Sequence, residues 1–185
     1  MARIELPPGD ELTAWLSLSP LGESLGAFAA VVYSRSRLSL REFEAARTRV
    51  ALSNGCVTCL NTRHAEGDRH GLDPEFYANV ARWREHPGYT ERERLAIEFA
   101  ERFCERWSED APGFWERLRK AYGDGEIVDL AIQVAELVGA GRILRMLDIA
   151  QSCGLTIHPD QRMELHPLAE RGPATRLPPA SRASQ

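Results

Sequence analysis

The sequence predicts an all-α fold, and two observations carry that prediction. Helical patterns follow one another through most of the 185 residues, and no run alternates apolar and polar residues long enough to indicate a convincing strand. Capping boxes at 39–42 and 90–93 mark two helix starts, because each Ser or Thr and the Glu three residues later can bond a free backbone amide. Length and composition fit one domain over residues 1–166. A Pro-, Arg-, Ala- and Ser-rich tail at 167–185 is expected to be disordered.

Helix signals are strongest in the first third of the chain. Ser19-Pro20 is typical of a helix start, with an N-cap followed by proline in the first turn. The capping box at Ser39 begins a helix that is expected to run to about Ser53, and Asn54-Gly55 ends it. Its inward residues are expected to be Phe43, Ala46 and Val50.

Further helices are predicted at 56–67, at 74–84, after Thr90, from Asp110 to Tyr122, and from Asp124 onward. After Thr90, one apolar stripe is formed by Leu95, Phe99 and Phe103. In the last helix, Gly139 and Gly141 indicate close helix packing or a break. Its inner face is expected to comprise Ile127, Leu130, Ala131, Val134, Leu137 and Val138.

Charge and hydropathy narrow the classes of partner. The net charge of -4 and the pI near 5.8 argue against nucleic acid as the main partner. No segment reaches the ~20 apolar residues that span a bilayer, so we expect no membrane association. The first eight residues lack the pattern of a secretory signal, which predicts a cytoplasmic protein. In a reducing cytosol a close Cys pair is more often catalytic, redox-sensing or metal-binding than structural.

The motif that carries chemistry is Cys56-Val57-Thr58-Cys59, which follows the helix-ending Asn54-Gly55. A helix N-terminus concentrates partial positive charge, so a thiol placed there ionises more readily, and the thiolate is the reactive form. Two thiols one helical turn apart can alternate between dithiol and disulfide. The motif therefore predicts redox chemistry.

Residues around the motif suggest how the thiols are assisted. On a helical wheel, Cys56, Cys59 and Arg63 share one face, whereas His64 points elsewhere. Arg63 cannot transfer a proton but can stabilise a thiolate or an anionic substrate. Glu44, in the preceding helix, could reach the thiols, and partial burial would raise its pKa and make it a general base.

Other interpretations stay open from the residues alone. Glu44 could be a solvated surface acid, and the Cys pair could be buried without chemistry. A structural zinc site usually takes four ligands from two such pairs, whereas Cys104 and Cys153 stand apart and are interpreted as packing residues. A thioredoxin-like fold requires strands alternating with helices, and the sequence shows no such alternation.

The combination of motif and helices resembles the carboxymuconolactone decarboxylase superfamily, and within it the alkylhydroperoxidase D-like (AhpD-like) proteins. The family pattern is a Glu, eleven residues, Cys-x-x-Cys, three residues and usually a His. Glu44, Cys56 and Cys59 fit this spacing, and the family His falls on Arg63. The resemblance spans about residues 15–157, with further support at 89–101 and at 125–147.

The resemblance implies an AhpD-like helical fold with the Cys-x-x-Cys at the N-terminus of a central helix, in a homo-oligomer that is trimeric or built from trimers. It implies a thiol-dependent peroxidase in which Cys59 attacks a hydroperoxide and Cys56 then forms the disulfide. Glu44 would assist proton transfer and Arg63 would hold the thiolate. An external dithiol, a lipoyl group or a small redox protein, would reduce the pair, and no metal, haem or flavin is needed.

Two other functions remain. The superfamily includes lactone decarboxylases, which do not need a thiol pair, so Cys56 and Cys59 argue against that branch. A non-enzymatic oligomeric module whose Cys pair senses oxidation is the other alternative.

Overall fold

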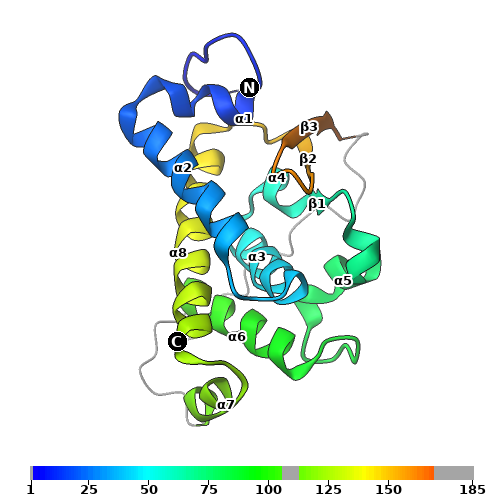
Figure 1. Ribbon diagram of the computed structural model, residues 1–185. Helices are drawn as coiled ribbons and strands as arrows, with labels where there is room; N and C mark the ends of the chain where they lie inside the picture. The colour runs from blue at the N-terminus through cyan, green and yellow to red at the C-terminus, as the bar shows by residue number, and fades with distance from the viewer. Residues whose placement is uncertain (1, 106–112, 169–185) are drawn as a thin grey trace, which may run out of the picture.

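The computed structural model describes residues 2–105 and 113–168 and is mostly helical, as predicted (Figure 1). A small three-stranded sheet, which was not predicted, joins the helices. The α-helices are α1 (Glu11–Ala14), α2 (Pro20–Arg35), α3 (Leu40–Asn54), α4 (Val57–Leu60), α5 (Pro74–Asn79), α6 (Glu91–Glu105), α7 (Phe114–Ala121) and α8 (Asp124–Leu147). The 3-10 helices are η1 (Leu16–Leu18), η2 (Gly67–His70) and η3 (Val80–Arg82), and the strands are β1 (Thr62–His64), β2 (Cys153–Ile157) and β3 (Met163–Pro167).

The core lies around α3, which packs against both α6 and α8. Figure 1 shows α8 as the long helix along one side of the molecule, with α2 running beside it. The residues predicted to face inward from α3 (Phe43, Ala46 and Val50) are all buried. The predicted inner face of α8 contributes Leu130 and Val134 to the same cluster as Leu95 of α6. These buried apolar surfaces hold the helices together.

Local signals set both ends of α3, as predicted. The Glu42 backbone N–H donates to Ser39 Oγ (3.3 Å), and the Ser39 N–H donates to a Glu42 carboxylate oxygen (3.0 Å). Gly55 ends the helix at φ 62°, a left-handed conformation that glycine adopts without a Cβ penalty. The chain therefore turns sharply just before Cys56.

The helix predicted over 56–67 is wrong beyond Leu60. Asn61 caps α4, and its side-chain Nδ2 donates to the Val57 carbonyl (2.8 Å). The next three residues form β1, which pairs in parallel with β2, while β2 pairs antiparallel with β3. Bonds such as that from the Leu155 N–H to the Asn61 carbonyl (3.1 Å) join segments far apart in sequence. A three-residue strand held by such pairing leaves no local periodicity to detect.

The structure differs from the sequence prediction in one further helix and agrees with it in the last one. The expected helix at 74–84 is divided into α5 and η3, and α8 continues unbroken through Gly139 and Gly141. Asp110 and the predicted tail from residue 169 onward lie outside the described residues. No described helix combines the length and apolar character needed to cross a membrane.

Candidate active site

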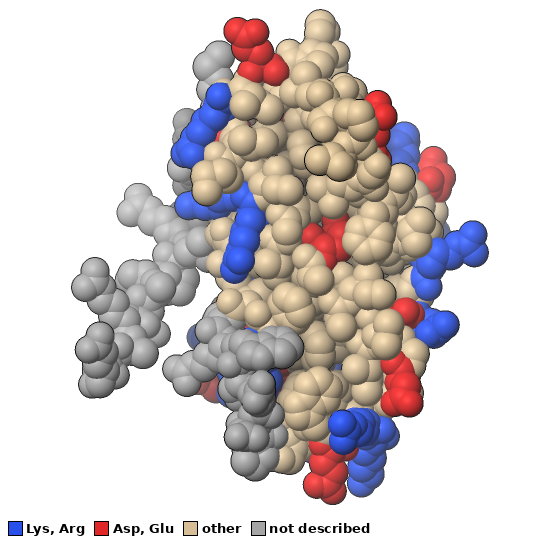
Figure 2. All heavy atoms as spheres, turned by 90° about the vertical axis from the view of Figure 1, so that its left-hand side faces the viewer, with Lys and Arg blue, Asp and Glu red and all other residues tan. Residues whose placement is uncertain are grey.

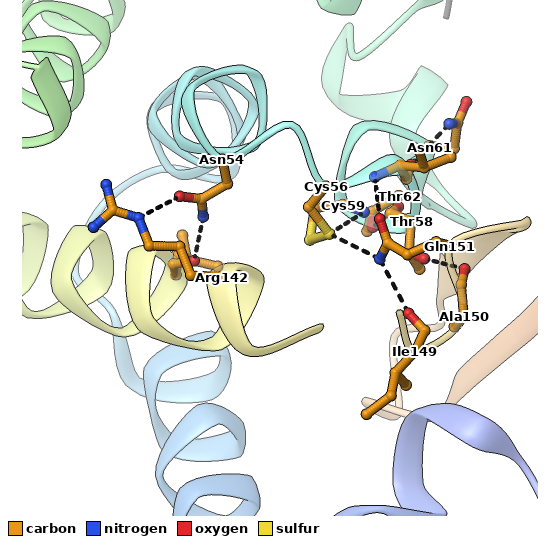
Figure 3. The surroundings of a disulfide bond; sticks show 12 residues. Asn54, Cys56, Thr58, Cys59, Asn61, Thr62, Arg142, Ile149, Ala150 and Gln151 are labelled. Carbon is orange, nitrogen blue, oxygen red and sulfur yellow. Dashed lines mark hydrogen bonds between the residues drawn. A yellow bond between two sulfur atoms is a disulfide. The ribbon is translucent and has the colours of Figure 1, made fainter. Parts of the chain in front are cut away.

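The two cysteines of the motif are joined in a disulfide at the start of α4 (Figure 3). Cys56 is the N-cap residue of α4, and its Sγ accepts a hydrogen bond from the Cys59 backbone N–H (3.3 Å). The side chain of Gln151 approaches the same sulfur, with its Nε2 at 3.7 Å. Because α4 has only four residues, these individual donors matter more to a sulfur's charge than a helix dipole does.

The two sulfurs differ in access. Cys56 is fully buried, whereas Cys59 is half-buried and lines a cavity of about 300 Å³. The cavity lies between α2, α3, α4 and α8, and its walls are largely aliphatic, with Leu25, Leu137 and Leu144 among them. A molecule that enters this cavity therefore meets Cys59 and not Cys56.

A close approach of α8 positions Cys59. A Cβ at Gly141 would lie 2.6 Å from Asn54 Nδ2, which is too close, and 3.6 Å from Cys59 Sγ, which is an ordinary contact distance. Asn54 Nδ2 donates to the Leu137 carbonyl (3.1 Å), and Arg142 Nε donates to Asn54 Oδ1 (3.2 Å), as Figure 3 shows. Of the two interpretations of Gly141, the structure supports close helix packing.

Glu44 is fully buried and tightly paired. Arg47 donates to both of its carboxylate oxygens (Nε at 2.7 Å and Nη2 at 2.8 Å), and the Tyr77 hydroxyl donates at 3.0 Å. Burial acts to raise the pKa of Glu44, but the charge of Arg47 and the neighbouring His64 outweigh it and lower the pKa to about 2. The prediction that burial raises this pKa is wrong, and so is the picture of a solvated surface acid. At neutral pH the carboxylate is ionised and is a weak base.

Arg63 and His64 do not lie on the helix that the helical wheel assumed. They lie in β1, where successive side chains point to opposite faces. The Arg63 guanidinium lies 3.9 Å from the centre of the Tyr77 ring, while His64 Nε2 lies 3.5 Å from Glu44 Oε1. The wheel prediction was wrong because it assumed a helix where the chain forms a strand. The imidazole that approaches Glu44 therefore belongs to His64, one residue after the position where the family usually has its His.

The guanidinium that reaches the motif belongs to Arg47. Its Nη1 donates to the Cys59 backbone carbonyl (2.5 Å), its Nη2 donates to the Thr62 carbonyl (3.2 Å), and its side chain lines the cavity. Its spacing from Glu44, three residues along one helix, was a signal that could have identified the pair. Arg47 thus holds α4 and β1 against α3.

Glu136 is the second residue that sequence reasoning missed. It lies on α8, is 6% exposed and lines the same cavity as Cys59. Burial raises its pKa to about 7. The sequence carried a signal, because Glu136 is the only acidic residue between Asp129 and Asp148, in a mostly apolar helical stretch.

Replacing Glu136 with Gln should stabilise the protein at alkaline pH. The folded-state pKa of about 7 lies above the ordinary value of 4.5, so the parent loses stability as pH rises from about 4.5 to 7. This shift corresponds to about 3 kcal/mol at pH 8, and a neutral Gln avoids that cost. Urea unfolding of the parent and the variant at pH 5 and pH 8 measures this difference in stability. Equal gains in the free energy of unfolding at the two pH values would show that ionising Glu136 does not destabilise the folded protein.

The described residues contain no group of three or more His, Cys, Asp or Glu side chains placed to hold a metal ion. Cys104 and Cys153 take part in no disulfide there. The zinc alternative therefore gains no support from the described part of the chain.

Comparisons with known proteins find a family model and solved structures that are similar to this chain. The carboxymuconolactone decarboxylase family model matches residues 20–102. Among solved structures, the chain is similar to a protein of unknown function from Agrobacterium tumefaciens that is described as a candidate antioxidant defence protein AhpD. That match has 23% identity, covers 80% of this chain and 96% of the other, and has a TM-score of 0.65.

Two further structures share the fold. One is an uncharacterized peroxidase-related protein from Ralstonia eutropha JMP134, described as an alkylhydroperoxidase AhpD core, with 18% identity, 75% coverage of each chain and a TM-score of 0.63. The other is a cysteine-to-alanine variant of the debrominase Bmp8 in complex with 2,3,4-tribromopyrrole, with 13% identity, 75% and 74% coverage and a TM-score of 0.61.

No curated protein matches the chain. The family match includes α3 and the Cys-x-x-Cys segment, and the structural likeness to the Agrobacterium protein covers 80% of this chain. Residues 20–102 match the carboxymuconolactone decarboxylase family model, and the chain shares its fold with solved structures that are described as AhpD-like.

Proposed function

We propose that the protein is a thiol-dependent peroxidase that reduces hydroperoxides through the Cys56–Cys59 pair. The observation that carries the proposal is the difference in access between the two sulfurs. Cys59 faces a cavity, and Cys56 is buried directly behind it within bonding distance. A peroxidatic thiol needs access to its oxidant, while a resolving thiol needs access only to its partner.

The chemistry balances with these two residues. The Cys59 thiolate attacks the terminal oxygen of ROOH, the O–O bond breaks, and the products are a sulfenic acid on Cys59 and RO⁻, which takes a proton and leaves as ROH. The Cys56 thiol then attacks the sulfenic sulfur, and a disulfide and water form. An external dithiol, a lipoyl group or a small redox protein, returns both cysteines to thiols in the cytoplasm.

The buried pair of Glu44 and Arg47 has a positioning role in this proposal. Glu44 is too acidic to accept a proton at neutral pH, but it fixes Arg47, which bonds the Cys59 carbonyl. Arg63 lies against Tyr77 and is not among the described residues that line the cavity. Its role in holding the thiolate rests on the family resemblance alone.

The fold does not select the reaction. A debrominase shares it, and the superfamily name denotes a decarboxylase, so activity must be argued from the site. The adjoining thiols favour peroxide reduction over proton transfer on a lactone. In a redox-sensing module the Cys pair would be oxidised in the same way, but the protein would not catalyse repeated reduction of peroxide by a dithiol.

A turnover assay tests the proposal. With excess dihydrolipoamide, we expect the protein to convert many equivalents of cumene hydroperoxide to cumyl alcohol. A single equivalent converted per chain would instead identify a sensor. No loss of peroxide or of thiols would overturn the peroxidase assignment, and turnover of a carboxylated lactone by the double Cys56→Ser, Cys59→Ser variant would identify a decarboxylase.

We also propose that the chain assembles as a homo-oligomer, a trimer or a multiple of trimers, through the face formed by α2 and α8. Large apolar side chains are exposed there, and Leu21 is 82% exposed. The others on these two helices are Phe28, Val31, Val128, Ile132 and Met146. Figure 2 shows that charged side chains are sparse in the middle of this face. Exposed apolar patches of this kind mark interaction sites. Sedimentation of a monomer at micromolar concentration would contradict the assembly.

A further inference from the structure

Glu136 lies on the wall of α8 that forms the thiol cavity. Five residues of this helix line the cavity at i, i+1, i+4, i+5 and i+8, which is one helix face: Glu136, Leu137, Ala140, Gly141 and Leu144. Glu136 is thus the single acidic group among the described residues of the lining. It is almost completely removed from bulk solvent.

Glu136 Oε2 has no hydrogen-bond partner among the described residues. The indole Nε1 of Trp15, which also lines the cavity, has none either. An unpaired buried polar group destabilises the folded state, and such groups in a native structure call for a specific reason. Both residues line one cavity, so a molecule there that carries oxygen atoms can bond to both.

The charged and titratable groups that face Glu136 leave its carboxyl without a fixed counter-charge. From α2, Tyr33 lines the cavity, and burial raises the pKa of its phenol, which stays neutral. From α3, Arg47 lines it but is paired with Glu44. From α4, Cys59 is the reacting thiol, and the lining residues of β2 and β3 (Leu155 and Met163) are apolar.

The protonation state of Glu136 suits a group that both accepts and donates a proton. Burial raises its pKa to about 7, whereas the pKa of Glu44 is about 2. Acid–base catalysis is most effective when the pKa lies near the working pH, because both forms are then populated. Of the two buried carboxyls near the motif, only Glu136 meets this condition.

Resting on the proposed peroxidase function, we propose that Glu136 is the catalytic proton shuttle of the cavity. Its carboxylate takes the proton from the Cys59 thiol through one water in the cavity, leaving the thiolate. The thiolate attacks the terminal peroxide oxygen, and the electron pair of the broken O–O bond goes to the RO⁻ leaving group. Glu136 returns its proton to this oxygen, so ROH leaves and the carboxylate is regenerated.

The geometry leaves room for the substrate between the two groups. Cys59 Sγ lies against α8 at Gly141, and Glu136 precedes Gly141 by five residues. Five residues rise about 7.5 Å along an α-helix. Because both residues line the cavity, a hydroperoxide bound there can lie between the carboxyl and the sulfur.

Single-turnover oxidation of the reduced protein by cumene hydroperoxide tests the shuttle. We expect Glu136→Gln to lower the second-order rate constant at pH 7 by about 100-fold, the usual contribution of a positioned acid–base group. The pH dependence of the rate near pH 7 should disappear with it. Glu136→Asp, which keeps the acid, should retain part of the rate and the pH dependence.

Three controls separate this role from a structural one. Glu116→Gln, an exposed residue of α7, should react like the parent. At pH 10, where hydroxide ionises the thiol without help, Glu136→Gln and the parent should be alkylated by iodoacetamide at equal rates. Infrared difference spectra should show a protonated carboxyl that titrates near pH 7 in the parent and is missing in Glu136→Gln.

The outcomes are distinguishable. If the parent oxidises and Glu136→Gln matches its rate and pH profile, the shuttle is overturned and the peroxidase function stands. If the parent itself does not react with the hydroperoxide, the proposed function fails and the shuttle fails with it. Slow alkylation of Glu136→Gln at pH 10 would show that the substitution blocks access to Cys59, and would also overturn the shuttle.

Discussion

Cys59→Ser should abolish hydroperoxide reduction, and Cys56→Ser should arrest it at a sulfenic acid. Cys59 is the sulfur that lines the cavity, so its loss removes the nucleophile. Cys56 is fully buried behind it and acts only on the oxidised Cys59. In stopped-flow mixing with cumene hydroperoxide, the first variant should show no fast phase. The second should oxidise once and then react with dimedone, a reagent specific for sulfenic acids.

Cys153→Ser is the matched control, because Cys153 is half-buried and outside the disulfide. It should behave like the parent. The assignment of roles would be reversed if Cys56→Ser lost the fast phase and Cys59→Ser gave the dimedone adduct. Peroxide consumption at the parental rate by both single variants would remove the pair from the reaction altogether.

Arg47→Met should destabilise the folded protein by about 3–5 kcal/mol at pH 7, because it leaves Glu44 ionised and buried without its partner. In the parent, the pKa of Glu44 is lowered from 4.5 to about 2. The stability it contributes is therefore present above pH 4.5 and is lost as pH falls toward 2. In the variant that contribution is missing, so the difference between parent and variant should shrink in acid. Urea unfolding at pH 7 and pH 4 measures both effects.

Arg69→Met provides the contrast. Arg69 pairs with Glu66 at the same i,i+3 spacing, but its side chain is 75% exposed. Exposed pairs contribute about 0–1 kcal/mol, so this variant should lose little stability. The double variant Glu44→Gln, Arg47→Met should recover part of the loss, since no buried charge remains. A loss in Arg47→Met no larger than that in Arg69→Met would contradict the description of a buried, essential pair.

The sequence predicted well where the signals are local. Ser39 and Gly55 mark the ends of α3 through their own backbone contacts, and the apolar spacing around Leu130 and Val134 defines the inner face of α8. The mostly helical fold follows from these patterns. β1 could not be predicted in this way, because Thr62–His64 is a strand only through its pairing with β2, far along the chain.

That missed strand accounts for the errors at the site. Extending α4 past Leu60 placed Arg63 beside the thiols and turned His64 away, whereas strand alternation puts His64 against Glu44. The pKa of Glu44 was misjudged because Arg47 was not considered as its partner. Glu136 was missed because only the packing of α8 across the end of α3 brings it to the cavity of Cys59.

The most direct test of the central claim is mass spectrometry of the reduced protein after one equivalent of cumene hydroperoxide, with unreacted thiols alkylated afterwards. The account predicts an intramolecular Cys56–Cys59 disulfide, alkylated Cys104 and Cys153 after unfolding, and one equivalent of cumyl alcohol. Alkylated Cys56 and Cys59 together with intact hydroperoxide would contradict it.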